Sequence, residues 1–283
     1  MIPVGQSNQA RQSFLAYSLR DATATSTALL RLAEHVVITM GAVYQMTSSG
    51  NVTVLHSFGF VGTEGAAADS GLTLASDGNL YGTTKAGGTH NLGTIFMISV
   101  PDGTLTYLHQ VIGTDGAYPT APPIQGSDGY FYGTTWQAGT NNGTAYRMAP
   151  KSPWTLTSYS LPGFAYPTAP LMQATDGNFY GATSGGGTHG FGTVFRMTSK
   201  GKFKFIYNFN NVDGASPKAP VIQGSDGNFY GTTSAGGNLS ACKDLRVQGA
   251  SGGAFAWRAP KFPRLCQIHH LPYIWNNQNL FRQ

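Results

Sequence analysis

Four aspartates, each followed by glycine, recur at nearly equal steps and could form a ring of metal-binding carboxylates. The steps of 51, 48 and 50 residues separate Asp77, Asp128, Asp176 and Asp226. Calcium takes about six to eight oxygen ligands, and a calcium loop gathers several acidic residues within about twelve positions. Each Asp-Gly loop here offers one aspartate and at most one asparagine. We therefore interpret the aspartates as turn residues that bind their own backbone, and we expect no metal and no cofactor.

Two histidines, His90 and His189, occupy matching Gly-Gly-Thr-His loops and could face each other across an opening. Neither has a cysteine, an aspartate or a third histidine at the spacing of zinc ligands, so we predict ligand binding for them and not zinc. Cys266 with His269 and His270 is a similarly incomplete cluster. Cys242 could add a ligand there, but a disulfide or two free thiols fits the two cysteines better.

Lys85, Trp136 and Lys218 interrupt the repeated pattern and are the remaining candidates for ligand binding. Trp136 replaces the serine or lysine that follows the threonines in the sister units. An exposed tryptophan can stack on a sugar or hold a cation, and it can equally pack between repeat units. No paired carboxylates and no Ser/His/Asp pattern stand out, so we assign no catalytic residue and favour a protein without enzymatic activity.

Three sequence markers with a period near 50 residues define the elements that hold these side chains. Besides Asp-Gly, a strand-like GTVFRM pattern begins at Gly41, Gly93, Gly143 and Gly192, and a proline-bearing segment occupies 118–122, 166–170 and 216–220. Each unit contains a short apolar stretch, the turn, an aromatic NFYGTT stretch, the alternating GTVFRM stretch and a fourth β-rich stretch. This pattern predicts an all-β fold, a β-propeller of about four four-stranded antiparallel blades.

The ends of the chain leave two architectures open. Residues 41–58 correspond to the third and fourth strands of a unit, and residues 219–233 to the first and second, so together they could form a composite blade that closes a four-bladed ring. Alternatively, the chain is a fragment of a larger propeller, and the residues favour neither architecture. The predicted N-terminal extension spans residues 1–40 and contains a potential helix at 13–37. The repeat domain spans 41–237, with three whole blades at about 70–111, 120–161 and 168–209. An irregular basic tail spans 238–283.

Charge is distributed unevenly and excludes an extended nucleic-acid surface. The net charge is +5, but residues 41–240 carry 8 lysines and arginines against 9 acidic residues, whereas residues 241–283 carry 6 against 1. No ribonucleoprotein or zinc-finger pattern accompanies the basic tail, so we expect no nucleic-acid partner. No apolar run approaches the roughly 20 residues of a membrane span. The N-terminal residues also lack the apolar segment of a secretory signal.

The repeated DGN(F/L)YGTT, followed by GGT and GTVFR, resembles the GloVer tandem repeat of bacterial "choice-of-anchor" surface proteins. The resemblance covers roughly residues 41–237. It implies a propeller-like protein that is extracellular or at the cell surface, and it brings no catalytic residues with it. The chain shows neither the signal peptide nor the sorting motif of those proteins.

These observations lead to a non-catalytic β-propeller scaffold that binds an unknown ligand, carbohydrate or protein, at or outside the cell surface. We expect a monomer. Two alternatives stay open: a carbohydrate-active propeller hydrolase or lyase in which Trp136 stacks on the sugar, and a truncated product without independent function.

Overall fold

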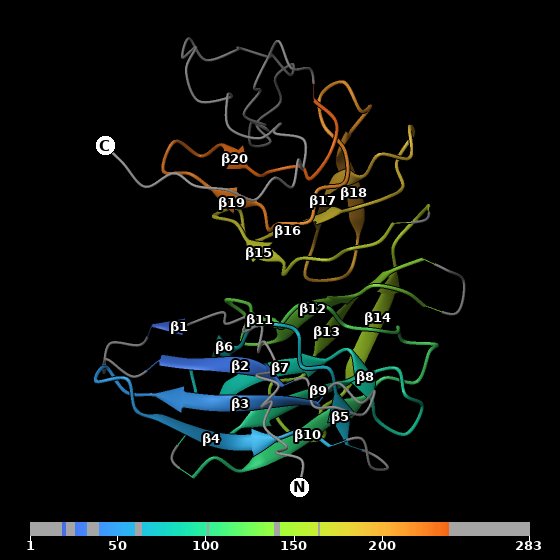
Figure 1. The fold of residues 1–283 in the computed structure, drawn as a ribbon. Helices are drawn as coiled ribbons and strands as arrows, with labels where there is room; N and C mark the ends of the chain where they lie inside the picture. The colour runs from blue at the N-terminus through green and yellow to red at the C-terminus, as the bar shows by residue number, and fades with distance from the viewer. Residues whose placement is uncertain are drawn as a thin grey trace, which may run out of the picture.

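The computed structural model describes residues 19–20, 26–32, 40–59, 64–100, 102–138, 142–163 and 165–237 (Figure 1). These residues form β-strands joined by turns and loops, with no helix among them, and therefore none that could cross a membrane. The predicted all-β class is confirmed. The tail 238–283, with Cys242, Cys266, His269 and His270, lies outside the described residues, as does most of the 1–40 extension.

Four four-stranded antiparallel sheets follow one another along the chain, and we call them blades I to IV. Blade I contains β1 (Leu19–Arg20), β2 (Ser26–Leu32), β3 (Met40–Met46) and β4 (Val52–Ser57). Blade II contains β6 (Thr73–Leu74), β7 (Leu80–Thr84), β9 (Thr94–Ile98) and β10 (Leu105–Gln110). Blade III contains β11 (Ile124–Gln125), β12 (Phe131–Thr135), β13 (Thr144–Met148) and β14 (Leu156–Ser160). Blade IV contains β15 (Met172–Gln173), β16 (Phe179–Thr183), β17 (Thr193–Met197) and β18 (Phe203–Asn208).

Two short two-stranded sheets accompany the blades in the described residues. The final hairpin pairs β19 (Ile222–Gln223) with β20 (Phe229–Tyr230), and β5 (Gly65–Ala66) pairs with β8 (Ala86–Gly87) beside blade II. In Figure 1 blades I and II lie in the lower part of the view, and blade IV and the final hairpin lie in the upper part. The architecture is that of a β-propeller, in which successive four-stranded sheets pack face to face.

The structure corrects the predicted pairing of the first unit. Strand β3 pairs with β2 along seven residues, and β20 pairs with β19, so 41–58 and 219–233 do not form a composite blade. Residues 26–32 are a strand and not part of the potential helix at 13–37. The physical reason lies in the serine- and threonine-rich stretch that leads into β2, because these residues form helices poorly and threonine favours a strand.

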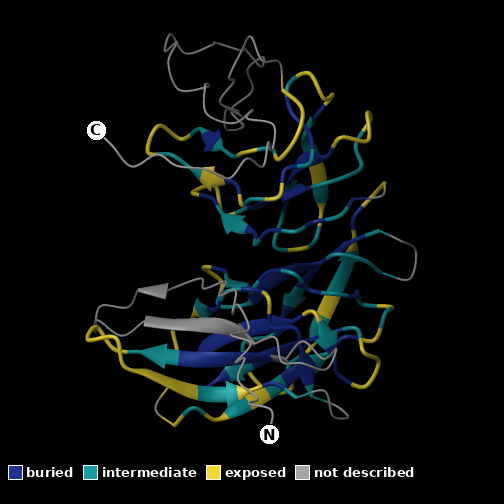
Figure 2. Ribbon diagram, in the orientation of Figure 1, coloured by how far each residue is buried: buried dark blue, intermediate teal, exposed yellow. Residues whose placement is uncertain are grey.

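Aromatic stacking joins blade II to blade III, blade III to blade IV, and blade IV to the final hairpin. Tyr81 stacks on Phe131 of the following blade with 4.1 Å between ring centroids, and two further pairs repeat this contact at 3.9 and 4.2 Å. Those pairs are Tyr132 with Phe179 and Tyr180 with Phe229. The second strands that carry these rings, β7, β12 and β16, are buried along their whole length (Figure 2). At each of these three interfaces, the tyrosine comes from one unit and the phenylalanine from the next.

In blades II to IV, the glycine of the Tyr-Gly-Thr-Thr or Tyr-Gly-Ala-Thr sequence makes room for an aromatic ring of the neighbouring strand. A Cβ on Gly82 would lie 2.5 Å from the Phe96 ring, and one on Gly181 would lie 2.6 Å from the Phe195 ring. Carbon atoms cannot approach so closely without displacing the ring or the strand. Glycine at this position is thus a packing requirement of the blade.

Candidate binding site

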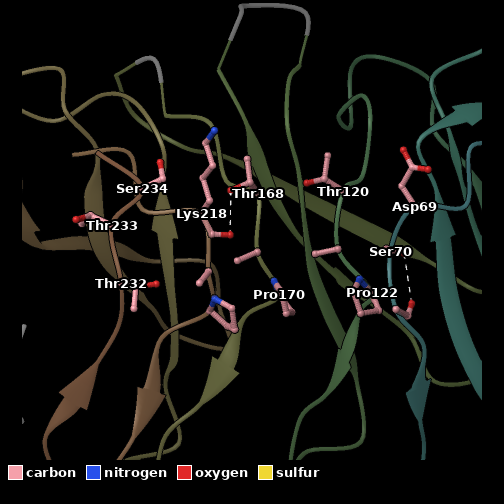
Figure 3. Close-up of a pocket in the computed structure, with 15 residues that line it drawn as sticks. Asp69, Ser70, Thr120, Pro122, Thr168, Pro170, Lys218, Thr232, Thr233 and Ser234 are labelled. Atoms are coloured by element: carbon pink, nitrogen blue, oxygen red, sulfur yellow. Dashed lines mark hydrogen bonds between the residues drawn. The ribbon is translucent and has the colours of Figure 1, made fainter. Parts of the chain in front are cut away.

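The segments that lead into the first strand of successive repeat units surround a hollow of about 630 Å³ (Figure 3). We call them the lead-in segments, and each contributes three residues to the lining: 69–71, 120–122, 168–170 and 218–220. Three of these segments end in proline, whose fixed φ and missing N–H suit the first residues of an unpaired strand edge. Thr232, Thr233 and Ser234, which follow β20, complete the lining.

The first position of the lead-in segments sets the charge of the hollow. It holds Asp69, Thr120, Thr168 and Lys218 in chain order, and Figure 3 shows the two threonines between the aspartate and the lysine. Asp69 and Lys218 are the two charged side chains of the lining, and both are exposed. The hollow therefore presents one charge of each sign among hydroxyl groups, proline rings and small side chains.

Three aromatic side chains outside this lining contact one another, and we call them the aromatic platform: Tyr118, Trp136 and Tyr166. The Trp136 ring lies 6.3 Å from the Tyr118 ring and 5.6 Å from the Tyr166 ring, centroid to centroid. All three are half-buried. Tyr118 and Tyr166 precede Thr120 and Thr168 of the lining by two residues, which puts the platform next to the lead-in segments of blades III and IV.

The same backbone bond holds the platform position in every unit. The N–H of Trp136 donates to the carbonyl of Tyr118 at 3.1 Å, and the equivalent bonds measure 3.0, 2.8 and 3.2 Å. Their donors and acceptors are Lys85 with Ala67, Ser184 with Tyr166, and Ser234 with Ser216. Alanine, serine and lysine thus satisfy the same backbone geometry, so the fold does not require aromatic side chains here.

The structure separates the predicted ligand-binding residues. Lys218 lines the hollow, Trp136 belongs to the platform, and Lys85 is exposed at the position equivalent to Trp136. His90 and His189 are exposed on their loops, and His90 Nδ1 lies 2.9 Å from Thr89 Oγ1. Within the described ranges no three histidine, cysteine or acidic side chains gather in a group that could hold a metal ion.

The four repeated aspartates are turn residues, as predicted. In each turn an aspartate oxygen accepts the backbone N–H two residues later, at 3.0 to 3.2 Å. The other oxygen accepts the hydroxyl of the tyrosine four residues later, at 2.6 to 2.8 Å. Burial and the hydrogen bond to Asp176 raise the pKa of Tyr180 to about 12. The Tyr180 hydroxyl therefore stays protonated and continues to donate to Asp176.

Sequence reasoning missed a glutamine that connects neighbouring blades. Gln125 accepts the backbone N–H of Ser76 in the preceding blade at 2.8 Å, and two further glutamines repeat this bond at 2.8 and 3.0 Å. Those bonds join Gln173 to Ser127 and Gln223 to Thr175. The sequence did contain a signal for these bonds, because a glutamine recurs two residues before the Ser-Asp-Gly or Thr-Asp-Gly turn. The first turn lacks this glutamine and has Leu74 in its place.

A histidine–aspartate pair lies outside the hollow and has a structural role. His109 Nε2 lies 2.6 Å from Asp115 Oδ2, and Asp115 also accepts the backbone N–H of Ile112 at 2.9 Å. Burial acts to raise the pKa of Asp115, but these hydrogen bonds outweigh it and hold the pKa below its usual value. In blade IV, Tyr207 donates to Asp213 at the equivalent place. Because a tyrosine replaces the histidine, the pair fixes the loop and is not a catalytic dyad.

The sequence model of the Gloeobacter/Verrucomicrobia repeat matches residues 28–243. A comparison with curated proteins found no match. Among solved structures, the chain is similar to a protein provisionally assigned as a 6-phosphogluconolactonase from Bacteroides uniformis (12% identity, TM-score 0.48, 76% of this chain and 62% of that chain). It is also similar to TolB from Acinetobacter baumannii (14%, 0.44, 74% and 49%) and to an α-L-arabinofuranosidase from Clostridium thermocellum (13%, 0.42, 79% and 82%). The chain thus spans less than two thirds of the first two, and at these values none of the three bears on activity.

Proposed function

Because the chain belongs to the Gloeobacter/Verrucomicrobia repeat family and its repeats build a β-propeller, we propose a non-catalytic binding protein that holds its ligand in the hollow. One observation carries this proposal: the repeat units are otherwise equivalent, yet the residues in which they differ lie together in the lining of the hollow. Asp69, Thr120, Thr168 and Lys218 occupy the same repeat position yet differ in charge and size. Residues that only support the repeat, such as the stacked Tyr-Phe pairs, do not vary in this way.

The dimensions and the chemistry of the hollow support binding of a small molecule or of one segment of a larger one. A volume of about 630 Å³ falls within the range of roughly 300–1,000 Å³ that small-molecule sites occupy. Its hydroxyl groups can donate and accept hydrogen bonds, and its two charges sit on a rigid scaffold where ligand recognition commonly resides. We propose that binding takes place at or outside the cell surface, which the likeness to choice-of-anchor proteins supports.

A substitution that fills the hollow tests this proposal. Thr168 lines the hollow and its hydroxyl makes one long bond of 3.5 Å to the carbonyl of Lys218, so Thr168→Trp should fill the space and keep the fold. Thr157→Trp, on the exposed face of the outer strand β14, is the matched control. The full chain is screened by calorimetry against soluble polysaccharides, peptidoglycan fragments and peptide pools.

We expect at least one ligand whose binding is lost in Thr168→Trp and kept in Thr157→Trp, with circular dichroism unchanged in both variants. Binding that survives in Thr168→Trp would show that the hollow is not the site. A wild-type protein that binds no member of the screen would contradict the proposal as a whole.

A further inference from the structure

We infer that the ligand is a neutral saccharide, which stacks on the aromatic platform of Tyr118, Trp136 and Tyr166 and directs hydroxyl groups into the hollow. This inference rests on the proposed function and adds to it the class of ligand. The platform and the hollow adjoin through the lead-in segments, since Tyr118 and Tyr166 each stand two residues before a threonine of the lining.

Tyr118 of the platform has a backbone conformation that a bulky residue does not favour. Tyr118 has a φ of +57°, in the left-handed region that bulky residues rarely adopt. Ala67 and Ser216 have nearly the same φ, +56° and +51°, at the equivalent positions of their units. Because a smaller residue satisfies this backbone elsewhere in the chain, the backbone does not require a tyrosine here, and its ring is open to a role in binding.

The contacts among the platform rings leave no place for a cation between them. A cation is held when it lies over ring faces within about 6 Å of their centroids. The platform rings are in direct contact, with centroids 5.6 and 6.3 Å apart, so no cation fits between Trp136 and either tyrosine. The lining carries one charge of each sign, Asp69 and Lys218, so it offers a cation no excess of negative charge.

The lining favours a polyhydroxylated ligand without net charge. Asp69 opposes the charge of Lys218, and the other polar side chains of the lining are hydroxyls of serine and threonine. Thr120 Oγ1 and Thr168 Oγ1 donate long bonds of 3.4 and 3.5 Å to backbone carbonyls, and both oxygens keep the capacity to accept. A sugar presents C–H groups to an aromatic face and hydroxyls at its edge, which matches a platform beside a hydroxyl-lined hollow.

The test measures binding of named neutral saccharides to the full-length protein by calorimetry: laminarin, xylan, galactomannan and cellohexaose. The variants place sister residues at the platform: Trp136→Ser, Tyr118→Ala and Tyr166→Ser, as in Ser184, Ala67 and Ser216. Trp154→Phe, whose side chain packs in the core between blades II and III, is the control. Sodium polygalacturonate and tetramethylammonium serve as the anionic and cationic probes.

We expect binding of at least one neutral saccharide, weakened roughly tenfold or more in Trp136→Ser, which is the loss typical of a central aromatic contact. Trp154→Phe should bind as the wild type does. Saccharide binding that is unchanged in Trp136→Ser, or binding of the charged probes alone, would overturn the inference. If no neutral saccharide binds, but another ligand binds and Thr168→Trp abolishes that binding, the inference fails while the proposed function stands.

Discussion

The hydroxyl of Tyr146 should destabilise the protein, and Tyr146→Phe should remove that cost. Tyr146 is 1% exposed, and its Oη has no hydrogen-bond partner among the described residues. Burial accordingly raises the pKa of the phenol. The equivalent residues of blades II and IV are phenylalanines, Phe96 and Phe195, so the site accepts a ring without the oxygen.

The magnitude follows from the environment of the oxygen. A buried polar group without a partner costs about 1–3 kcal/mol, and phenylalanine keeps the ring contacts while removing the group. We therefore expect the free energy of unfolding to rise by about 1 kcal/mol or more, with a melting temperature higher by about 2–4 °C per kcal/mol in a domain of this size.

The assay is urea unfolding of the full chain followed by circular dichroism, with Tyr132→Phe as the matched control. Tyr132 Oη donates to Asp128 Oδ2 at 2.7 Å and accepts from Arg147 Nε at 3.1 Å, so its loss should destabilise by about 1–2 kcal/mol. If Tyr146→Phe destabilises as much as Tyr132→Phe does, the Tyr146 hydroxyl has a partner, such as a buried water, and the reasoning is refuted.

Three further predictions test the blades and their joints. Gly181→Ala should destabilise by about 1–3 kcal/mol because the new Cβ would overlap the Phe195 ring, and an unchanged thermal midpoint would contradict that packing. Burial lowers the pKa of His56 despite the opposing charge of Glu64, so the unfolded state takes up a proton at a higher pH than the folded state. The free energy of unfolding should therefore fall as the pH drops below about 6.5. His56→Tyr should flatten this dependence in urea titrations at pH 5 to 8. Gln173→Ala should cost about 1 kcal/mol through loss of its bond to the blade III turn, and faster hydrogen exchange at Ser127 would show that the turn has loosened.

Much of the fold was predictable because its signals are local and repeated. The Asp-Gly turns, the Phe-Tyr strands and the strand that begins Gly-Thr recur at fixed spacing, and each encodes its own conformation through turn geometry or side-chain alternation. The partner of β3 was not predictable in this way. Strand β2 carries none of the repeated markers, and its place in blade I depends on pairing across seven residues and not on local propensity.

The candidate site was predictable only in part. Lys218 and Trp136 stood out as departures from the repeat, but Asp69 did not, because the first unit lacks the proline that marks the other lead-in segments. The platform partners Tyr118 and Tyr166 also escaped notice, since a tyrosine before proline looks like an ordinary part of the marker. Only the packing of adjacent blades shows that both rings contact Trp136.

The stacked tyrosine–phenylalanine pairs give the array a direction. Each blade from II to IV contributes a tyrosine to the joint with the next unit, and that unit contributes a phenylalanine. Each joint therefore has two different halves, a tyrosine half and a phenylalanine half. A segment that spans one whole period therefore begins and ends with matching halves wherever it is cut. Duplication or loss of a whole period in the gene would leave every remaining joint complementary, whereas a change of any other length would interrupt a blade.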